Sequence, residues 1–129
     1  MSARDELAAR LAALAGEDYC YLTTTGRVTG KPHEIEIWFG AQNGSVYLLS
    51  GGGAGADWVK NLRKNPNVQV RIARKYFEGA ARLVQDEAEE WTARNMLADK
   101  YHERESDGSL SEWARTALVV AIDLNESTL

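Results

Sequence analysis

Two glycine-rich segments are the clearest candidates for ligand-binding chemistry in the sequence. The first, residues 50–55, holds four glycines among six residues, directly after a predicted strand and directly before a predicted helix. Glycines let a ligand approach the backbone and expose successive N–H groups, and a helix N-terminus favours negative charge. The segment suits an anion cradle or, equally, a flexible turn. It lacks the Gly-Lys-Ser/Thr of a P-loop and the βαβ setting of a dinucleotide fingerprint.

The second segment, residues 23–32, combines a run of three threonines with two glycines, Thr29, Arg27 and Lys31. Hydroxyl, backbone and cationic donors therefore occur within ten residues. Such donors suit a phosphate or a carboxylate, which accepts charge-assisted hydrogen bonds. An ordinary connection between strands with solvated charges would have the same composition.

Other arrangements of catalytic residues are missing from the sequence. There are two histidines, His33 and His102, and no HExxH or CxxC spacing, so we expect no metal site. No G-x-S-x-G elbow is present, which argues against a serine hydrolase. Cys20 lies in an apolar, aromatic run and is predicted to be a buried structural thiol. Glu34 and Glu36 share one strand face, which we interpret as a solvated or interface face.

One tryptophan and one basic stretch stand near the first glycine segment. The chain has four tryptophans, and we expect most of them to serve in packing. Trp58 enters a predicted helix just after the glycines and is the one best placed beside a ring system. Residues 60–75 carry six Lys or Arg residues and no acid. This basic zone suits a small anionic ligand, although an exposed, solvated face is the commoner reason for a charge run.

Length and charge limit the classes of protein that remain. With 129 residues, the chain fits one domain over residues 1–129. A net charge of −4 argues against a nucleic-acid binder, which needs an excess of cations. No apolar run is long enough to span a membrane, and no hydrophobic signal core begins the chain. A single cysteine fits a reducing compartment. We therefore expect a soluble, cytoplasmic protein with a small-molecule ligand.

The periodicity of apolar residues predicts alternating helices and strands. Asn43-Gly44 is a strong hairpin signal, and Gly16 and Asn65-Pro66 are predicted to end helices. The last predicted long helix places Ala88, Trp91, Ala98 and Tyr101 near one face. The predicted helices cover residues 3–15, 57–64 (with Asp57 as N-cap) and 86–104, and the predicted strands cover residues 19–25, 33–39, 45–49, 68–72, 77–84 and 117–124.

About six strands in so short a chain, with a hairpin and few long crossovers, favour a mostly antiparallel sheet. The fold class we predict is α+β, mainly β. Its architecture would be a small split β-barrel with flanking helices.

The order of these segments resembles the deazaflavin-dependent nitroreductase family, relatives of the split barrels similar to pyridoxamine-phosphate oxidase. The family pattern is T-T-x-G-R-x-[ST]-G, then S-x-G-G, then W-x-x-N-L and N-P-x-V. This chain carries it as Thr24 to Gly30, Ser50 to Gly53, Trp58 to Leu62 and Asn65 to Val68. The resemblance covers about residues 20–72.

The resemblance implies a homodimeric split barrel that binds the deazaflavin coenzyme F-420 and passes hydride to a nitro, quinone or activated-alkene group. The loop around Arg27 would meet the coenzyme's phosphate, and the first glycine segment would lie against its ring. Tyr101 or His102 would be candidates for donating a proton. The implied cofactor-binding residues are Thr25, Gly26, Arg27, Thr29, Lys31, Ile35, Ser50, Gly51, Gly52, Trp58 and Asn61.

The chain departs from the family pattern at several positions of the implied site. Val28 stands where a lysine is frequent, His33 where an arginine is frequent, and Glu36-Ile37 where Pro-Leu is frequent. Fewer cations leave FMN open as the cofactor, in a reductase of the same fold. A redox-silent carrier of a flavin, haem or lipid is the alternative from another functional class.

Overall fold

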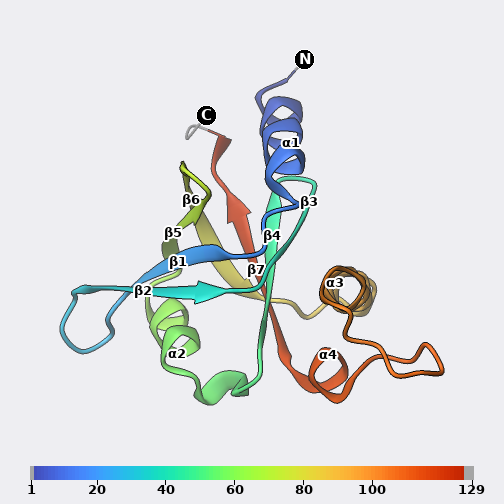
Figure 1. Ribbon diagram of the computed structural model, residues 1–129. Helices are drawn as coiled ribbons and strands as arrows, with labels where there is room; N and C mark the ends of the chain where they lie inside the picture. The colour runs from blue at the N-terminus through green and yellow to red at the C-terminus, as the bar shows by residue number, and fades with distance from the viewer. Residues whose placement is uncertain (1, 127–129) are drawn as a thin grey trace.

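The computed structural model describes residues 2–126, which form one seven-stranded sheet with helices packed against it (Figure 1). The elements in chain order are α1 Ala3–Leu14, β1 Cys20–Thr25, β2 Pro32–Ile37, β3 Gly40–Gln42, β4 Ser45–Ser50, the 3₁₀ helix η1 Gly53–Gly55, α2 Asp57–Lys64, β5 Asn67–Ile72, β6 Lys75–Leu83, α3 Glu87–Tyr101, α4 Glu112–Thr116 and β7 Leu118–Leu124. None of the helices in residues 2–126 is long and apolar enough to cross a membrane.

The sheet is curled, as its strand order requires. The order is β2-β1-β5-β6-β7-β4-β3, and every neighbouring pair is antiparallel. β2 and β3 stand at opposite edges of the sheet, yet only Trp38 and Phe39 connect them. Since two residues span only about 7 Å, the two edges must come close together. This half-closed barrel confirms the predicted α+β split barrel, with seven strands instead of about six.

The extra strand arises because the predicted strand at 33–39 is interrupted. β2 ends at Ile37, and the backbone at Phe39 bonds to side chains of α3 instead of a neighbouring strand. The Phe39 N–H donates to the Tyr101 hydroxyl at 3.0 Å, and the Phe39 carbonyl accepts from Lys100 Nζ at 2.9 Å. The Phe39 side chain is fully buried. The chain then resumes as β3, which pairs with β4 through the Asn43-Gly44 turn.

The core fills the inside of the curled sheet. Helix α1 closes one end with Leu7 and Leu11, and α2 packs below β1 with Val59 and Leu62 (Figure 1). All four of these leucine and valine side chains are buried. Cys20 is also buried, as predicted, and burial raises the pKa of its thiol to about 12.

Helix α3 differs in detail from the predicted helix at 86–104. Asp86 caps its N-terminus by accepting from the Glu89 N–H, and His102 ends it in the left-handed conformation at φ 58°. Of the residues predicted to lie near one face of this helix, Ala88 and Trp91 are exposed, Trp91 to 63%, and Ala98 is buried. The buried stripe runs instead through Ala93, Leu97 and Ala98.

Candidate functional site

A groove lies between the β1–β2 connection, the start of β2 and helix α2. Its volume is about 530 Å³, and we call it the loop groove. Apolar, cationic and acidic side chains all contribute to it. The lining residues are Thr24, Gly26, Arg27, Val28, Thr29, His33, Glu34, Ile35, Asp57, Trp58 and Asn61.

Asn61 on α2 holds the loop groove together. Its Oδ1 accepts from the Arg27 backbone N–H at 3.1 Å and from Arg27 Nη1 at 2.9 Å. Its Nδ2 donates to Thr24 Oγ1 at 3.2 Å. Asn61 and Thr24 are both buried, at 4% and 2% exposure, so these bonds are shielded from water. One amide side chain therefore fixes both the end of β1 and the guanidinium of Arg27.

A second set of contacts orients Arg27 and the loop that carries it. Arg27 Nη2 lies 3.1 Å from Asp57 Oδ1, and Lys64 Nζ donates to the Arg27 carbonyl at 2.9 Å. The Asp57 side chain is 86% exposed, so this ion pair is easily exchanged for another anion. The prediction that Asp57 caps α2 is wrong: Ala56 occupies the N-cap without a side-chain bond, and the Asp57 carboxylate turns to Arg27 instead.

Two glycines set the shape of the loop. At Gly26 a Cβ would lie 2.7 Å from Nε2 of the exposed His33 ring, which would have to shift, and 3.1 Å from the Lys31 carbonyl oxygen. Gly30 has a φ of +74°, which L-residues rarely adopt. The Gly26 N–H donates to the Lys31 carbonyl at 2.7 Å, and the Gly30 N–H donates to the Gly26 carbonyl at 2.9 Å. These bonds close the loop into a compact turn.

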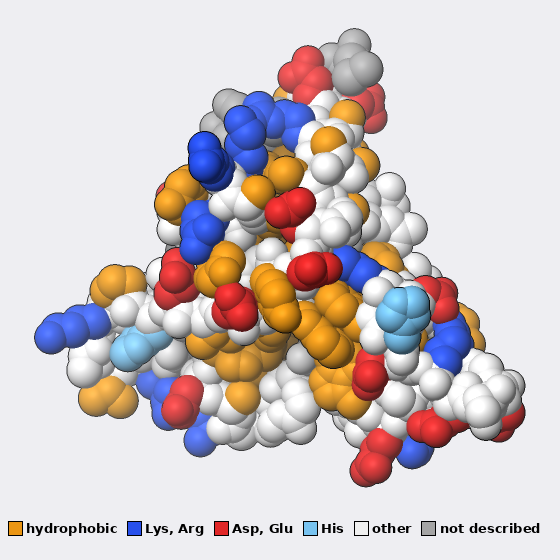
Figure 2. All heavy atoms as spheres, in the orientation of Figure 1, with side chains coloured by type: hydrophobic (Ala, Val, Ile, Leu, Met, Phe, Trp, Pro, Cys, Tyr) orange, Lys and Arg blue, Asp and Glu red, His pale blue; other side chains and the backbone are white. Residues whose placement is uncertain are grey.

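A second hollow lies where the other end of β2 meets α4 and the end of α3. Its volume is about 340 Å³, and we call it the aromatic pocket. Figure 2 shows hydrophobic side chains gathered along the lower side of β2, from the β1–β2 loop toward α4. The pocket's lining residues are Tyr19, Glu36, Ile37, Trp38, Leu49, Glu103 and Trp113.

The first glycine segment runs between the loop groove and the aromatic pocket. On one side it leads through η1 into α2 and Trp58, which lines the loop groove. On the other, a Cβ at Gly51 would lie 3.6 Å from the Trp113 indole, which lines the aromatic pocket. Ser50 is buried, and its hydroxyl donates to the Gly53 carbonyl at 2.9 Å, which shapes the turn.

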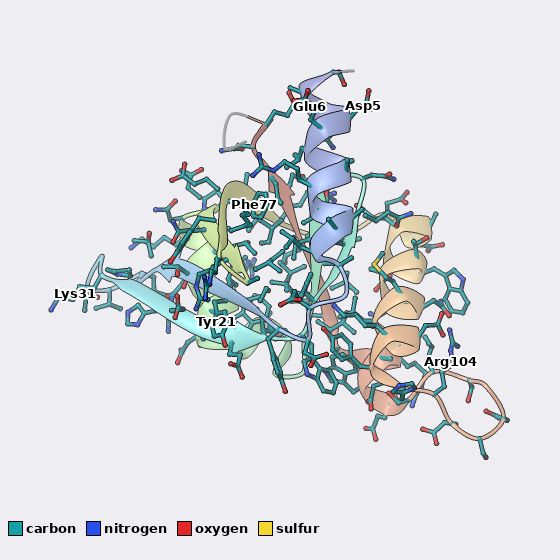
Figure 3. All side chains as sticks on the ribbon, turned by 45° about the horizontal axis from the view of Figure 1, so that its top comes forward. Asp5, Glu6, Tyr21, Lys31, Phe77 and Arg104 are labelled. Atoms are coloured by element: carbon teal, nitrogen blue, oxygen red, sulfur yellow. The ribbon has the colours of Figure 1, made fainter. Side chains whose placement is uncertain are left out.

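The structure brings six of the cofactor-binding candidates to one place and distributes the others around it. Thr25 faces hollows beside the loop groove, and Ser50, Gly51 and Gly52 lie at its far side toward the aromatic pocket. Figure 3 shows Lys31 at the outer end of the β1–β2 loop, away from the sheet. The six that line the loop groove are Gly26, Arg27, Thr29, Ile35, Trp58 and Asn61.

The two proton-donor candidates lie away from the loop groove. The Tyr101 hydroxyl donates to the Asp18 carbonyl at 2.8 Å and accepts from the Phe39 N–H, and burial raises its pKa to about 12. Its ring stacks on Trp38 at 4.2 Å. His102 is exposed at the end of α3, in a shallow hollow with Asp99. Tyr101 therefore borders the aromatic pocket through Trp38, and His102 does not.

Sequence reasoning missed several residues of these two sites. Asp57 precedes Asn61 by four positions, so the helical period places both on one face of α2, and this spacing could have signalled their shared role. Trp38, Trp113 and Glu103 form the aromatic pocket, but they come from segments without a recognisable motif. Within residues 2–126, no group of three or more His, Cys, Asp or Glu side chains could hold a metal ion.

Solved structures of other proteins share this architecture. A candidate pyridoxamine 5′-phosphate oxidase from Listeria innocua superposes with a TM-score of 0.67 at 20% identity, covering 96% of this chain and 94% of that one. A candidate 5-nitroimidazole antibiotic resistance protein from Bacteroides thetaiotaomicron gives 0.71 at 19% identity, covering 91% and 79%. An F420-H2 dependent reductase gives 0.65 at 20% identity, covering 81% and 93%.

The curled antiparallel sheet and these likenesses define the chain as a split-barrel protein. Its family follows from the sequence itself. The model of the F420H(2)-dependent quinone reductase family matches residues 3–111. The chain belongs to that family, and this confirms the resemblance found in the loop, glycine and helix motifs.

Proposed function

We propose that this chain binds the deazaflavin coenzyme F-420 in the loop groove and passes hydride from its reduced form to a small organic acceptor. The observation that carries the proposal is the fixed guanidinium of Arg27 at one side of a groove whose other side is apolar. A phosphorylated ring compound needs both features. Membership of the F420H(2)-dependent quinone reductase family supports this choice of coenzyme.

The polar side of the loop groove fits a phosphate. Arg27 presents a planar guanidinium that Asn61 orients from behind, and this arrangement suits bidentate anion binding. The residue that now faces the guanidinium is Asp57, whose carboxylate is mostly exposed. Exposed ion pairs contribute only about 0–1 kcal/mol, so a phosphate displaces this carboxylate at small cost. Thr29 lines the same side and adds a hydroxyl.

The apolar side of the loop groove fits a flat ring. Ile35 from β2 and Trp58 from α2 both line the groove and are half-buried. The glycine segment that follows Ser50 continues this surface toward the aromatic pocket without bulky side chains. A ring held here would have the aromatic pocket beside it for the acceptor.

The coenzyme supplies the hydride, and the residues of this chain supply binding and orientation. Arg27 and Asn61 would hold the anionic end of the coenzyme. Trp58 and Ile35 would shield its ring from water. We assign no proton donor, because the Tyr101 hydroxyl is occupied by backbone partners and His102 is exposed elsewhere.

We also propose that the chain works as a homodimer, as its resemblance to the nitroreductase-type split barrels implies. In a dimer, the exposed edge strand β2 would lie close to a partner. Light scattering coupled to size-exclusion chromatography tests this directly, and a mass equal to one chain at micromolar concentration would refute it.

The test of the proposed function is a fluorescence titration of the purified protein with F-420 and, in parallel, with FMN. We expect F-420 to bind with micromolar affinity or better. Arg27→Met should weaken binding at least about tenfold, because a charge-assisted hydrogen bond contributes about 1.5–3 kcal/mol. The control is Arg10→Met, an exposed residue of α1 outside the groove, and it should bind as the unchanged protein does.

Three outcomes would overturn parts of the proposal. Preferential binding of FMN would change the cofactor but keep the groove. Unchanged affinity in Arg27→Met would refute the phosphate position. Binding of neither compound, or binding without hydride transfer to a panel of quinones, nitroarenes, activated alkenes and N-alkylpyridinium or N-alkylquinolinium cations, would refute the reductase function.

A further inference from the structure

The aromatic pocket has walls that are already held in place. Trp38 stacks on Tyr101 with ring centres 4.2 Å apart and planes 4° apart. Trp113 meets Trp38 edge-on, with centres 5.5 Å apart and planes at 86°. The Tyr101 hydroxyl bonds to Asp18 and Phe39, so the ring behind Trp38 cannot turn away. An aromatic ligand would therefore find a preformed indole face and a second indole at a right angle to it.

The charge of this pocket has one sign. Its lining includes two carboxylates, Glu36 on β2 and Glu103 after α3, and no Lys, Arg or His. Glu36 accepts from the Tyr21 hydroxyl at 2.6 Å, and Glu103 accepts from the Ser111 hydroxyl at 3.1 Å. Each of these bonds is to a neutral hydroxyl, so it leaves the negative charge of the carboxylate uncompensated.

Cations on neighbouring segments face other partners. Arg104, next to Glu103, donates to Asp99 and Asn95. Arg71 lies over the Tyr21 ring, 4.0 Å from its centre, and also donates to the Ala73 carbonyl. Lys100 Nζ donates to the Phe39 carbonyl and lies 3.7 Å from the centre of that residue's ring. None of these side chains lines the aromatic pocket. The pocket thus combines π-faces with negative charge, the combination that binds organic cations.

We propose that the aromatic pocket binds a flat organic cation of the N-alkylpyridinium or N-alkylquinolinium class. The ring would lie against Trp38 with its edge toward Trp113, and its positive charge would face Glu36 and Glu103. This choice of ligand does not depend on the coenzyme. Its role as the hydride acceptor rests on the proposed function.

A cationic acceptor needs no proton donor, and neither Tyr101 nor His102 is placed to serve as one. A hydride accepted at the ring carbon para to nitrogen forms one C–H bond, and the C–H bond of the reduced deazaflavin that supplies it breaks. The acceptor is reduced to a neutral dihydro ring, the deazaflavin is oxidised, and the proton left on it goes to water. No side chain has to protonate the product. A nitro or quinone acceptor, by contrast, takes up protons during reduction.

The experiment is a binding titration without coenzyme, followed through the four indole N–H signals of the ¹⁵N-labelled protein. The probes are N-methylquinolinium and the neutral 4-methylquinoline, which has the same ring system and number of heavy atoms, at mildly alkaline pH. Trp38→Phe and Trp113→Phe assign two of the signals. We expect those two signals to shift, and the signals of Trp58 in the loop groove and Trp91 on α3 to stay.

Charge selectivity is the decisive result. We expect the cation to bind at least about tenfold tighter than the neutral probe. The double variant Glu36→Gln/Glu103→Gln should lose most of this preference and leave the affinity for 4-methylquinoline within about twofold. Exposed Glu105→Gln, outside the pocket, is the matched control.

Equal affinity for the two probes, or shifts confined to Trp58 and Trp91, would overturn the cation proposal. If the cation binds as expected but F-420 does not, the proposed function fails and the pocket assignment stands. If F-420 binds but the protein does not prefer the cation over the neutral probe, the pocket assignment fails and the proposed function stands.

Discussion

Replacing Asn61 tests most directly how the loop groove is built. Asn61→Ala removes two hydrogen bonds to Arg27 and one to Thr24. Each is worth about 1 kcal/mol. Alanine regains about 0.5 kcal/mol of helix propensity. The expected loss in the free energy of unfolding is therefore about 2.5 kcal/mol.

Asn61→Asp separates the stability of the loop from its charge. The carboxylate still accepts from the Arg27 backbone and guanidinium, and the Thr24 hydroxyl can turn to donate to it. At neutral pH we expect this variant to lose less than about 1 kcal/mol. Both variants should bind F-420 at least about tenfold more weakly, Ala because Arg27 is no longer fixed and Asp because its charge opposes the phosphate.

The assay is urea unfolding followed by tryptophan fluorescence, combined with the F-420 titration. Asn67→Ala, at an exposed position at the start of β5, is the control and should change stability by less than about 0.5 kcal/mol. The two Asn61 variants should differ in stability and agree in weakened binding. Equal stability loss in both would refute the acceptor role of Asn61, and a loss below about 0.5 kcal/mol in Asn61→Ala would refute its role as the anchor of the loop.

Three further predictions concern the loop, the sheet and the core. Gly30→Ala should lose about 1 kcal/mol in urea unfolding, because φ there is +74°, and an unchanged midpoint would contradict this backbone assignment. Arg82 binds the carboxylates of Glu89 and Asp123 and lowers the pKa of each. Its contribution to the free energy of unfolding is therefore present above their ordinary pKa of about 4 and is lost as pH falls through the lowered values. The difference in stability between the unchanged protein and Arg82→Met should shrink toward pH 3. Because burial raises the pKa of the Cys20 thiol to about 12, Ellman's reagent should label it only at the rate of unfolding, and fast labelling of the native protein would show that the thiol is accessible.

Local signals in the sequence predicted most of the fold. The Asn43-Gly44 turn has positive φ at both residues, 53° and 84°, as a primed hairpin turn requires. The six predicted strands correspond to β1, β2, β4, β5, β6 and β7, because alternation and β-branched residues are properties of each segment alone. β3 and α4 were missed. β3 has three residues and α4 has five, too few for a periodic pattern to emerge.

The break before β3 depends on a contact that no local pattern contains. The Phe39 N–H donates to the Tyr101 hydroxyl and its carbonyl accepts from Lys100 Nζ, 62 and 61 positions further along the chain. An alternating run such as residues 33–39 looks the same whether or not these partners exist. The tertiary bonds outweigh the strand preference here, and they turn the chain from one sheet edge to the other.

The residues of the candidate site could be predicted where the family pattern contains motifs from two distant segments. Arg27 and Asn61 are 34 positions apart, and the order of the loop and helix motifs placed both in one site before any contact was known. The partner of Arg27 was not predictable in the same way. Asp57 at a helix start is a good N-cap candidate by its residue type alone, but its carboxylate bonds instead to Arg27, 30 positions earlier in the chain.

The helix, more than the glycine segment, sets the geometry of the loop groove. Gly51 and Gly52 lie between the loop groove and the aromatic pocket, and they have no side chains that could shape the groove. Asn61 fixes the guanidinium, and the exposed Asp57 carboxylate pairs with it. Under the proposed function, a buried amide that orients a cation beside an exposed carboxylate would give a site preorganised for an anion. Binding of the anion would then cost the loop little ordering entropy.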